Sequence, residues 1–181
     1  MSAVINALQT NPELALVVAF IMRAALTWQR ELTWPEYRTL MGLKRLTFPR
    51  LQRLAPGGFD RFVNQKGGRD DPEFYATVGT DIRATVKRLR AGGGSLHLLS
   101  SLKRRPNVWG DPLSIAHVVW THDDGHQTEA YLFRNSDNTT DVYVHFEWSV
   151  TKPVDHLTTG QQNGDVRGVV ADAIAEVVDD E

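Results

Sequence analysis

The hydrophobic pattern of this chain changes its period near Pro106, and this change constrains the fold more than any single motif. Before Pro106, apolar residues recur at the three- and four-residue spacing of helices; after it, they alternate with polar residues as strands require. The pattern predicts an α+β protein with an N-terminal helical region, then a three-stranded antiparallel β-meander covered by a C-terminal helix. The regions 1–105 and 106–181 form two small domains or pack as one.

The charge of the chain changes at the same place. Residues 38–105 contain 15 Lys and Arg against 5 Asp and Glu, whereas residues 106–181 contain 3 against 14. A basic block attracts polyanions, so it favours nucleic acid as a partner. The acidic block repels nucleic acid and would instead suit a basic protein partner.

Two helix-start signals open the helical region. Residues 11–13, Asn-Pro-Glu, predict a helix that runs to about Leu32. This helix is apolar nearly all round, which indicates burial on most sides or a dimer seam. Thr33 and Glu36 have the spacing of a capping box, so a second helix is expected from there to about Gly42.

Residues 34–54 place Gly42 where a tight turn between two helices would need a positive φ angle. The residues expected to face inward from these helices are Tyr37, Met41, Phe48 and Leu51. This spacing resembles the helix-turn-helix motif of many bacterial and phage DNA-binding proteins, over these residues only. The resemblance implies that the second helix enters the major groove. Its polar residues near DNA would be Arg45, Thr47, Arg50 and Arg53. The alternative is a helical hairpin that only packs, with its arginines in solvent.

The rest of the basic region contains one clear helix pattern and one ambiguous segment. Residues 71–73, Asp-Pro-Glu, open an amphipathic helix that the glycines at 92–94 end. Residues 95–102 fit either a helix or a strand. The following cations, Lys103, Arg104 and Arg105, would form a solvated linker, or would add salt-sensitive affinity for a DNA backbone.

Three strands are expected in the acidic region, at residues 114–121, 127–134 and 141–150. Asp124 and Gly125 predict a type I′ hairpin turn between the first two strands. Residues 136–138 supply the next turn, and a last helix is expected at 169–178.

Histidines in the predicted strands raise the question of a catalytic or metal site. If the strand register puts His117 and His145 on one face, they and Glu147 would form an acid–base or metal cluster. The alternative for His117 is a hydrogen-bonded core residue. His122 and His126 flank the exposed hairpin tip, where nothing encloses a metal ion. Because no nucleophile motif is present, the sequence favours a protein that is not an enzyme and has no cofactor.

The sequence therefore favours a non-enzymatic protein that binds double-stranded DNA, as a transcriptional regulator or a mobile-element protein and as a possible homodimer. Its C-terminal region would bind a partner or a ligand. An inhibitor or immunity-type protein that uses the acidic region against a basic partner is the alternative, and an enzyme that uses the sheet histidines comes third. The chain has no cysteine and its most apolar stretch, residues 14–22, is too short to span a bilayer, so a cytoplasmic protein is expected.

Overall fold

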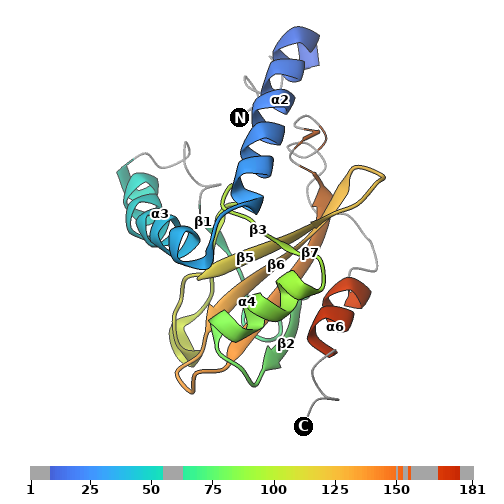
Figure 1. Ribbon diagram of the computed structural model, residues 1–181. Coiled ribbons are helices and arrows are strands. Elements are labelled where there is room, and N and C mark those ends of the chain that lie inside the picture. The colour runs from blue at the N-terminus through green and yellow to red at the C-terminus, as the bar shows by residue number, and fades with distance from the viewer. Residues whose placement is uncertain (1–8, 55–62, 150, 153–154, 156–166, 176–181) are drawn as a thin grey trace.

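The computed structural model describes residues 9–54, 63–149, 151–152, 155 and 167–175. Figure 1 shows the arrangement of its helices and strands. The helices are α2 (Pro12–Arg30), α3 (Trp34–Leu54), α4 (Ile82–Ala91) and α6 (Arg167–Ala175), with a 3₁₀ turn, η1 (Asn107–Trp109). The strands are β1 (Val63–Gln65), β2 (Phe74–Val78), β3 (Ser95–Leu96), β4 (Leu102–Arg104), β5 (Ala116–Thr121), β6 (His126–Arg134) and β7 (Thr140–Trp148). No helix in this part of the chain is both long and apolar enough to cross a bilayer.

The main sheet has five antiparallel strands in the order β2-β7-β6-β5-β3. The α+β class is confirmed, but the three-stranded sheet predicted from the sequence is wrong. Its central strands come from the acidic region, and β2 and β3 from the basic region pair with the two outer edges. Edge pairing satisfies backbone groups that a three-stranded sheet would leave to solvent. A separate parallel pair, β1 and β4, completes the strands of the described residues.

Both hairpin turns between the central strands have the same construction. Gly125 (φ 86°) and Asn138 (φ 66°) each end a three-residue loop in the left-handed region. In each loop the backbone N–H of this residue donates to the carbonyl three positions earlier. This is a type I turn followed by a left-handed residue, so the predicted type I′ turn is wrong. Glycine and asparagine occupy the positions because they tolerate a positive φ best.

Helix α3 is one continuous helix, and the turn predicted at Gly42 is wrong. Good helix formers flank Gly42 on both sides, and a glycine inside a helix costs only about 1 kcal/mol. The capping box at the start of α3 is confirmed, since the backbone N–H of Thr33 donates to the Glu36 carboxylate at 2.8 Å. Two helices separated by a turn, which a helix-turn-helix requires, are thus absent from residues 34–54.

The helix expected from residue 71 begins later than predicted. Residues 74–78 form β2 at the sheet edge, and α4 starts at Ile82. The sequence Phe-Tyr-Ala-Thr-Val is rich in aromatic and β-branched residues, which favour a strand. Asp81 then caps α4, because its carboxylate accepts the backbone N–H of Ala84 at 2.8 Å.

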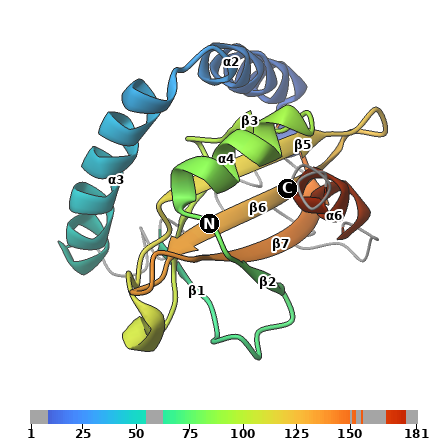
Figure 2. The ribbon, with the colours of Figure 1, turned by 60° about the horizontal axis from the view of Figure 1, so that its bottom comes forward.

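The sheet has two different faces. Apolar residues of one face pack against α4 and α6, which lie over that face in Figures 1 and 2. This core contains Val86, Leu89, Val118, Ala130, Leu132, Val142, Val170 and Ala173. The last helix is confirmed at residues 167–175. Residues 176–178 of this prediction, and residue 150 at the end of the third predicted strand, lie outside the described residues. The second face carries polar and charged side chains that are also buried, and it holds the candidate site.

Candidate functional site

The strand register puts His117 and His145 on the second face of the sheet. His145 on β7 lies directly opposite Glu129 on β6, and Gln127 lies opposite Glu147. His117 on β5 pairs with Tyr131, two residues along β6 from Glu129. Because side chains two apart on a strand share a face, Glu129 lies between the two histidines. His117 and His145 therefore share a face of the sheet, which the sequence alone did not determine.

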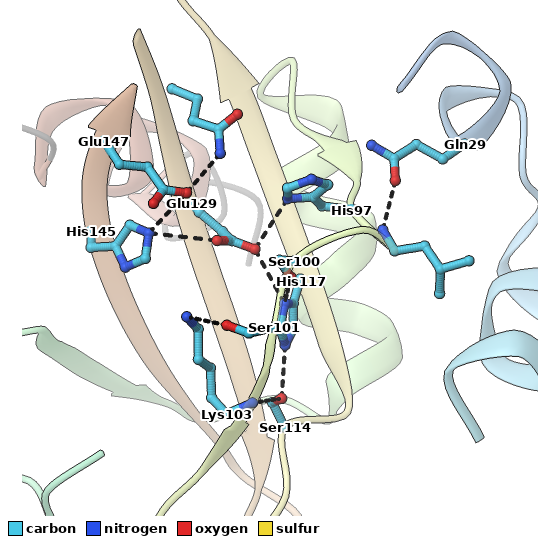
Figure 3. Close-up of polar contacts among 12 residues, drawn as sticks. Gln29, His97, Ser100, Ser101, Lys103, Ser114, His117, Glu129, His145 and Glu147 are labelled. Atoms are coloured by element: carbon cyan, nitrogen blue, oxygen red, sulfur yellow. Dashed lines mark hydrogen bonds and ion pairs between the residues drawn. The ribbon is translucent and has the colours of Figure 1, made fainter. Parts of the chain in front are cut away.

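Glu129 is the centre of the cluster. Its Oε1 atom lies 3.1 Å from His97 Nδ1 and 3.2 Å from His117 Nδ1, and its Oε2 atom lies 3.5 Å from His145 Nε2 (Figure 3). The Glu129 side chain is only 1% exposed. A carboxylate buried to this degree is stable only where charged or hydrogen-bonding partners surround it, and three histidines do so here.

The environment shifts the pKa of several of these groups. Burial alone would raise the pKa of Glu129, but attraction to His97 and hydrogen bonds from His117 and His97 hold it well below its usual value. Burial lowers the pKa of His117 to about 3, against the opposing effect of its hydrogen bond to Glu129. The site therefore combines an ionised carboxylate with a neutral imidazole at pH 7.

His145 lies between three carboxylates. Its Nε2 atom is 3.3 Å from Glu147 Oε1 and 3.5 Å from Glu129 Oε2, and its Nδ1 atom is 3.6 Å from Glu73 Oε2. The side chain is only 7% exposed, yet Nε2 makes no hydrogen bond of acceptable geometry to the described residues. Glu73, on the segment that enters β2, is itself paired with Lys66 at 2.5 Å. A carboxylate thus lies near the Nδ1 atom of the imidazole, and the Nε2 atom on the other side has no hydrogen bond.

Glu147 completes a set of three potential metal ligands. Its Oε1 atom accepts a hydrogen bond of 2.8 Å from Gln127 Nε2. One ligand atom each from Glu129, His145 and Glu147 lie within 4.8 Å of one another. Carboxylate oxygen and imidazole nitrogen together are typical ligands of divalent first-row metal ions.

Helices α2 and α3 position the segment that carries His97. The backbone N–H of Leu98 donates to Gln29 Oε1 on α2 at 2.7 Å, and Tyr37 OH on α3 accepts the backbone N–H of His117 at 2.9 Å. Lys44 Nζ on α3 also donates to the carbonyl oxygen of Leu98, at 2.9 Å. The N-terminal helices therefore form part of the site, although their sequences carry no ligand residue.

His117 also contacts two serines. Ser114 Oγ lies 2.7 Å from His117 Nε2, and Ser100 Oγ contacts His117 Nδ1. Ser114, His117 and Glu129 make the contacts of a hydrolase triad, with Ser114 and Glu129 at opposite nitrogens of the imidazole. However, Ser114 is fully buried, and its Oγ accepts the backbone N–H of Lys103. An oxygen enclosed in this way has no path to a substrate, so these contacts hold the imidazole in place.

The ring of Tyr131 contacts two histidines and lies under two lysines. Tyr131 lies under Lys103 Nζ at 4.6 Å and under Lys66 Nζ at 5.5 Å, measured to the ring centroid. Its ring meets that of His145 edge-on at 4.9 Å. The hydroxyl of Tyr131 is buried and has no hydrogen-bond partner among the described residues. Burial also lowers the pKa of Lys103. Two lysines and a tyrosine thus lie beside the histidines of the cluster.

The residues that the sequence assigned to DNA lie in different environments. Arg45 is half-buried in an ion pair with Asp111, and Thr47 Oγ1 donates to the carbonyl of Leu43 within α3. Arg50 and Arg53 are exposed near the end of α3, with Arg53 Nε donating to the carbonyl of Pro49. These side chains do not form one set, because a continuous helix turns them to different sides.

The solvated linker expected at residues 103–105 is wrong. Lys103 and Arg105 are buried, and Arg105 is paired with Asp141 inside the protein. Only Arg104 is partly exposed. Binding of double-stranded DNA, binding of a basic protein by the acidic region and homodimer formation all stay predictions.

Sequence reasoning missed Glu129, Glu73, His97 and Lys66. A signal for Glu129 was present: it alternates with Tyr131 and Phe133 in the middle of a strand, where an isolated carboxylate needs a partner. Glu73 was interpreted as a helix-start acid, and His97 lay in the segment that fitted two structures. Lys66 gave no signal, because only the loop before β2 brings it to the site.

The chain matches no protein-family model, and comparison with curated proteins and with solved structures gives no match either. What the protein does is therefore inferred from the side chains themselves.

Proposed function

We propose that the chain is a metal-dependent enzyme that binds one divalent first-row cation, such as Zn²⁺ or Mn²⁺, through Glu129, His145 and Glu147. The placement of His145 carries this proposal. Its Nε2 atom faces two carboxylates without a hydrogen bond, while its Nδ1 atom faces a third, that of Glu73. Metal-binding histidines commonly have such a carboxylate behind the ring, where it fixes the tautomer and raises the basicity of the ligand nitrogen.

Two of the three separations between the ligand atoms match those expected around a single ion. Two ligand atoms that each lie about 2.1 Å from one ion at the tetrahedral angle are about 3.4 Å apart. His145 Nε2 lies 3.3 Å from the Glu147 oxygen and 3.5 Å from the Glu129 oxygen. A cation between them would also offset the repulsion of two buried carboxylates.

Each of the three proposed ligands has a polar residue beside it. The outer contacts are Glu73 to His145, Gln127 to Glu147, and His97 and His117 to Glu129. Oriented ligands lose little conformational entropy when a metal ion binds, so these contacts support affinity as well as geometry.

The number of ligands favours catalysis over a structural role. The described residues supply three ligands, whereas structural zinc sites usually have four protein ligands. A divalent cation with three protein ligands supplies Lewis acidity to a bound water or substrate oxygen, which suits hydrolysis. The ring of Tyr131 contacts His145, and Lys103 lies over that ring. Groups with shifted pKa values also gather at catalytic sites more often than elsewhere.

Titration calorimetry with Zn²⁺ and with Mn²⁺ tests the proposal. Wild-type protein is expected to bind one ion. His145→Asn and Glu147→Gln are each expected to weaken binding about 100-fold, since each removes one of three ligands. His126→Asn is the matched control, because it removes an imidazole at the hairpin tip and leaves the cluster intact. Circular dichroism shows whether the variants fold. Equal loss in the control variant, or no binding by the wild type, would contradict the proposal.

Cobalt substitution tests whether the site is catalytic or structural. With Co²⁺ bound, the visible spectrum reports the coordination of the ion. An exchangeable position predicts that azide changes this spectrum in the wild type. A Co²⁺ spectrum that azide leaves unchanged would indicate a closed structural site and would contradict the enzymatic assignment.

A further inference from the structure

A second site lies in a basic groove between the start of α3 and α4. We define the basic groove by Trp34, Arg38, Arg83, Lys87 and Arg90. Two adjoining hollows of about 780 and 450 Å³ form it, and Trp34 and Arg83 line both. The helix α4 covers the face of the sheet opposite to His145, so the groove is separate from the metal site and does not depend on it.

The cations of the groove point to an anionic ligand. Arg83, Lys87 and Arg90 are spaced by four and three residues, which puts them on one stripe of α4. Arg38 on α3 adds a cation to the smaller hollow. All four are exposed, and among the described residues none of them has a carboxylate partner. Asp81 is the one acidic residue that lines the larger hollow within this part of the chain, and its carboxylate caps α4.

Trp34 gives the groove a flat aromatic wall. Its ring packs against the core and stacks on Tyr37, with centroids 5.9 Å apart and planes 15° from parallel. Its indole N–H is left without a hydrogen-bond partner among the described residues. Because this nitrogen is buried, a ligand in the groove would contact the ring of Trp34 and not its N–H.

We infer that the basic groove binds nucleoside phosphates, either as a free nucleotide or as part of a single strand of nucleic acid. Arginine and lysine hold phosphate oxygens through charge-assisted hydrogen bonds. Tryptophan offers a surface on which a base stacks, a combination found in proteins that bind single strands. A hollow of a few hundred Å³ is also the size of a small-ligand site. The basic region would thus bind a nucleotide or a single strand of nucleic acid through this groove, without a helix-turn-helix motif.

Fluorescence titration at about 50 mM salt tests the inference. ATP, a short oligothymidylate, inorganic triphosphate and polyglutamate serve as probes. We expect the wild type to bind ATP or the oligonucleotide more tightly than the two probes that lack a nucleoside. The tighter of the two nucleotide probes identifies the source of the ligand. Equal affinity for inorganic triphosphate or polyglutamate would overturn the inference, because the groove would then recognise charge alone.

Two charge-reversal variants locate the binding surface. Arg83→Glu with Lys87→Glu changes the groove, and Arg50→Glu with Arg53→Glu makes the same change in charge at the far end of α3. Arg50 lies 12 residues along the helix from Arg38, about 18 Å away. We expect about tenfold or greater loss of nucleotide affinity for the groove variant and less than twofold loss for the control. An unchanged groove variant, or an equal loss in the control, would overturn the inference. All four residues are exposed, so both variants should fold.

Discussion

Arg105 and Asp141 form an ion pair in which neither side chain is exposed to solvent. Asp141 also accepts hydrogen bonds from Thr77 at 2.6 Å and Asn135 at 2.9 Å, and it is paired with Arg69 at 3.0 Å. This carboxylate therefore joins β2, β7, the β6–β7 turn and the segment after β4. It lies on the same face of the sheet as His145 but takes no part in the proposed metal site, because its partners occupy both oxygens.

Removal of the charge on Asp141 should destabilise the fold strongly. Asp141→Asn leaves Arg105 buried without a counter-charge, and loss of one partner of a buried ion pair costs about 3–5 kcal/mol. Urea denaturation measures the free energy of unfolding. The matched control is Asp123→Asn at the exposed hairpin tip, which should change it by less than about 0.5 kcal/mol. A similar small change in Asp141→Asn would show that the ion pair contributes little.

The effect of Asp141 should disappear in acid. Burial alone would raise the pKa of Asp141, but hydrogen bonds from Thr77, Asn135 and Arg69 and the charge of Arg105 lower it below 3.8. A carboxyl with a lowered folded-state pKa stabilises the fold fully above its unfolded pKa, and loses this contribution as the pH falls through the folded value. The stability difference between wild type and Asp141→Asn should stay constant above about pH 5 and shrink below about pH 4. Denaturation curves collected across this range provide the measurement.

Lys44 predicts a stability change at alkaline pH. Burial lowers its pKa from 10.5 to about 8. Between these two values the unfolded chain holds a proton that the folded protein lacks, so the free energy of unfolding should rise with pH by up to about 1.4 kcal/mol per unit. Lys44→Met removes the titrating group and keeps the length of the side chain. The wild type should therefore gain stability relative to Lys44→Met between pH 8 and pH 10. A constant difference across this range would mean that Lys44 is not buried as described.

The hairpin turns predict a difference between two substitutions at Gly125. Gly125→Ala should cost about 1 kcal/mol, because alanine is strained at a φ of 86°. Gly125→Asn should cost less, since Asn138 adopts the same conformation in the other hairpin. Thermal denaturation of the two variants under identical conditions distinguishes them. Equal melting temperatures would argue that the turn relaxes to another conformation.

The sequence predicted helices and strands correctly where capping residues and hydrophobic periodicity determine them. The start of α2, the capping box at Thr33, the three central strands and the last helix were all found from periodicity and capping residues. The strand at residues 74–78 was missed because its apolar residues also fit the stripe of a helix. Pairing with β7, which lies about 65 residues later in the sequence, selects the strand, and no local pattern contains that information.

The candidate site was predictable only in part. His117, His145 and Glu147 were named as a group, but their meeting depended on a register that the sequence does not specify. Glu129 was not predicted as a site residue because a single carboxylate in a strand usually faces solvent. Here Glu129 is buried, because both faces of the sheet are covered. Lys103 and Arg105 were expected in solvent for the same reason, whereas both are buried. Charge patterns indicate exposure on average, whereas buried ion pairs form wherever distant segments supply the partner.

The pairing of β2 and β3 with opposite edges of the sheet has a consequence for the order of folding. β2 leaves the ribosome long before its partner β7, so its edge stays without a partner while the chain between them is synthesised. Pairings of such sequence separation are slow to form, because the loop must close before the contacts stabilise it. We therefore expect the five-stranded sheet, and with it the position of Glu73 near His145, to form after the three central strands have folded on one another.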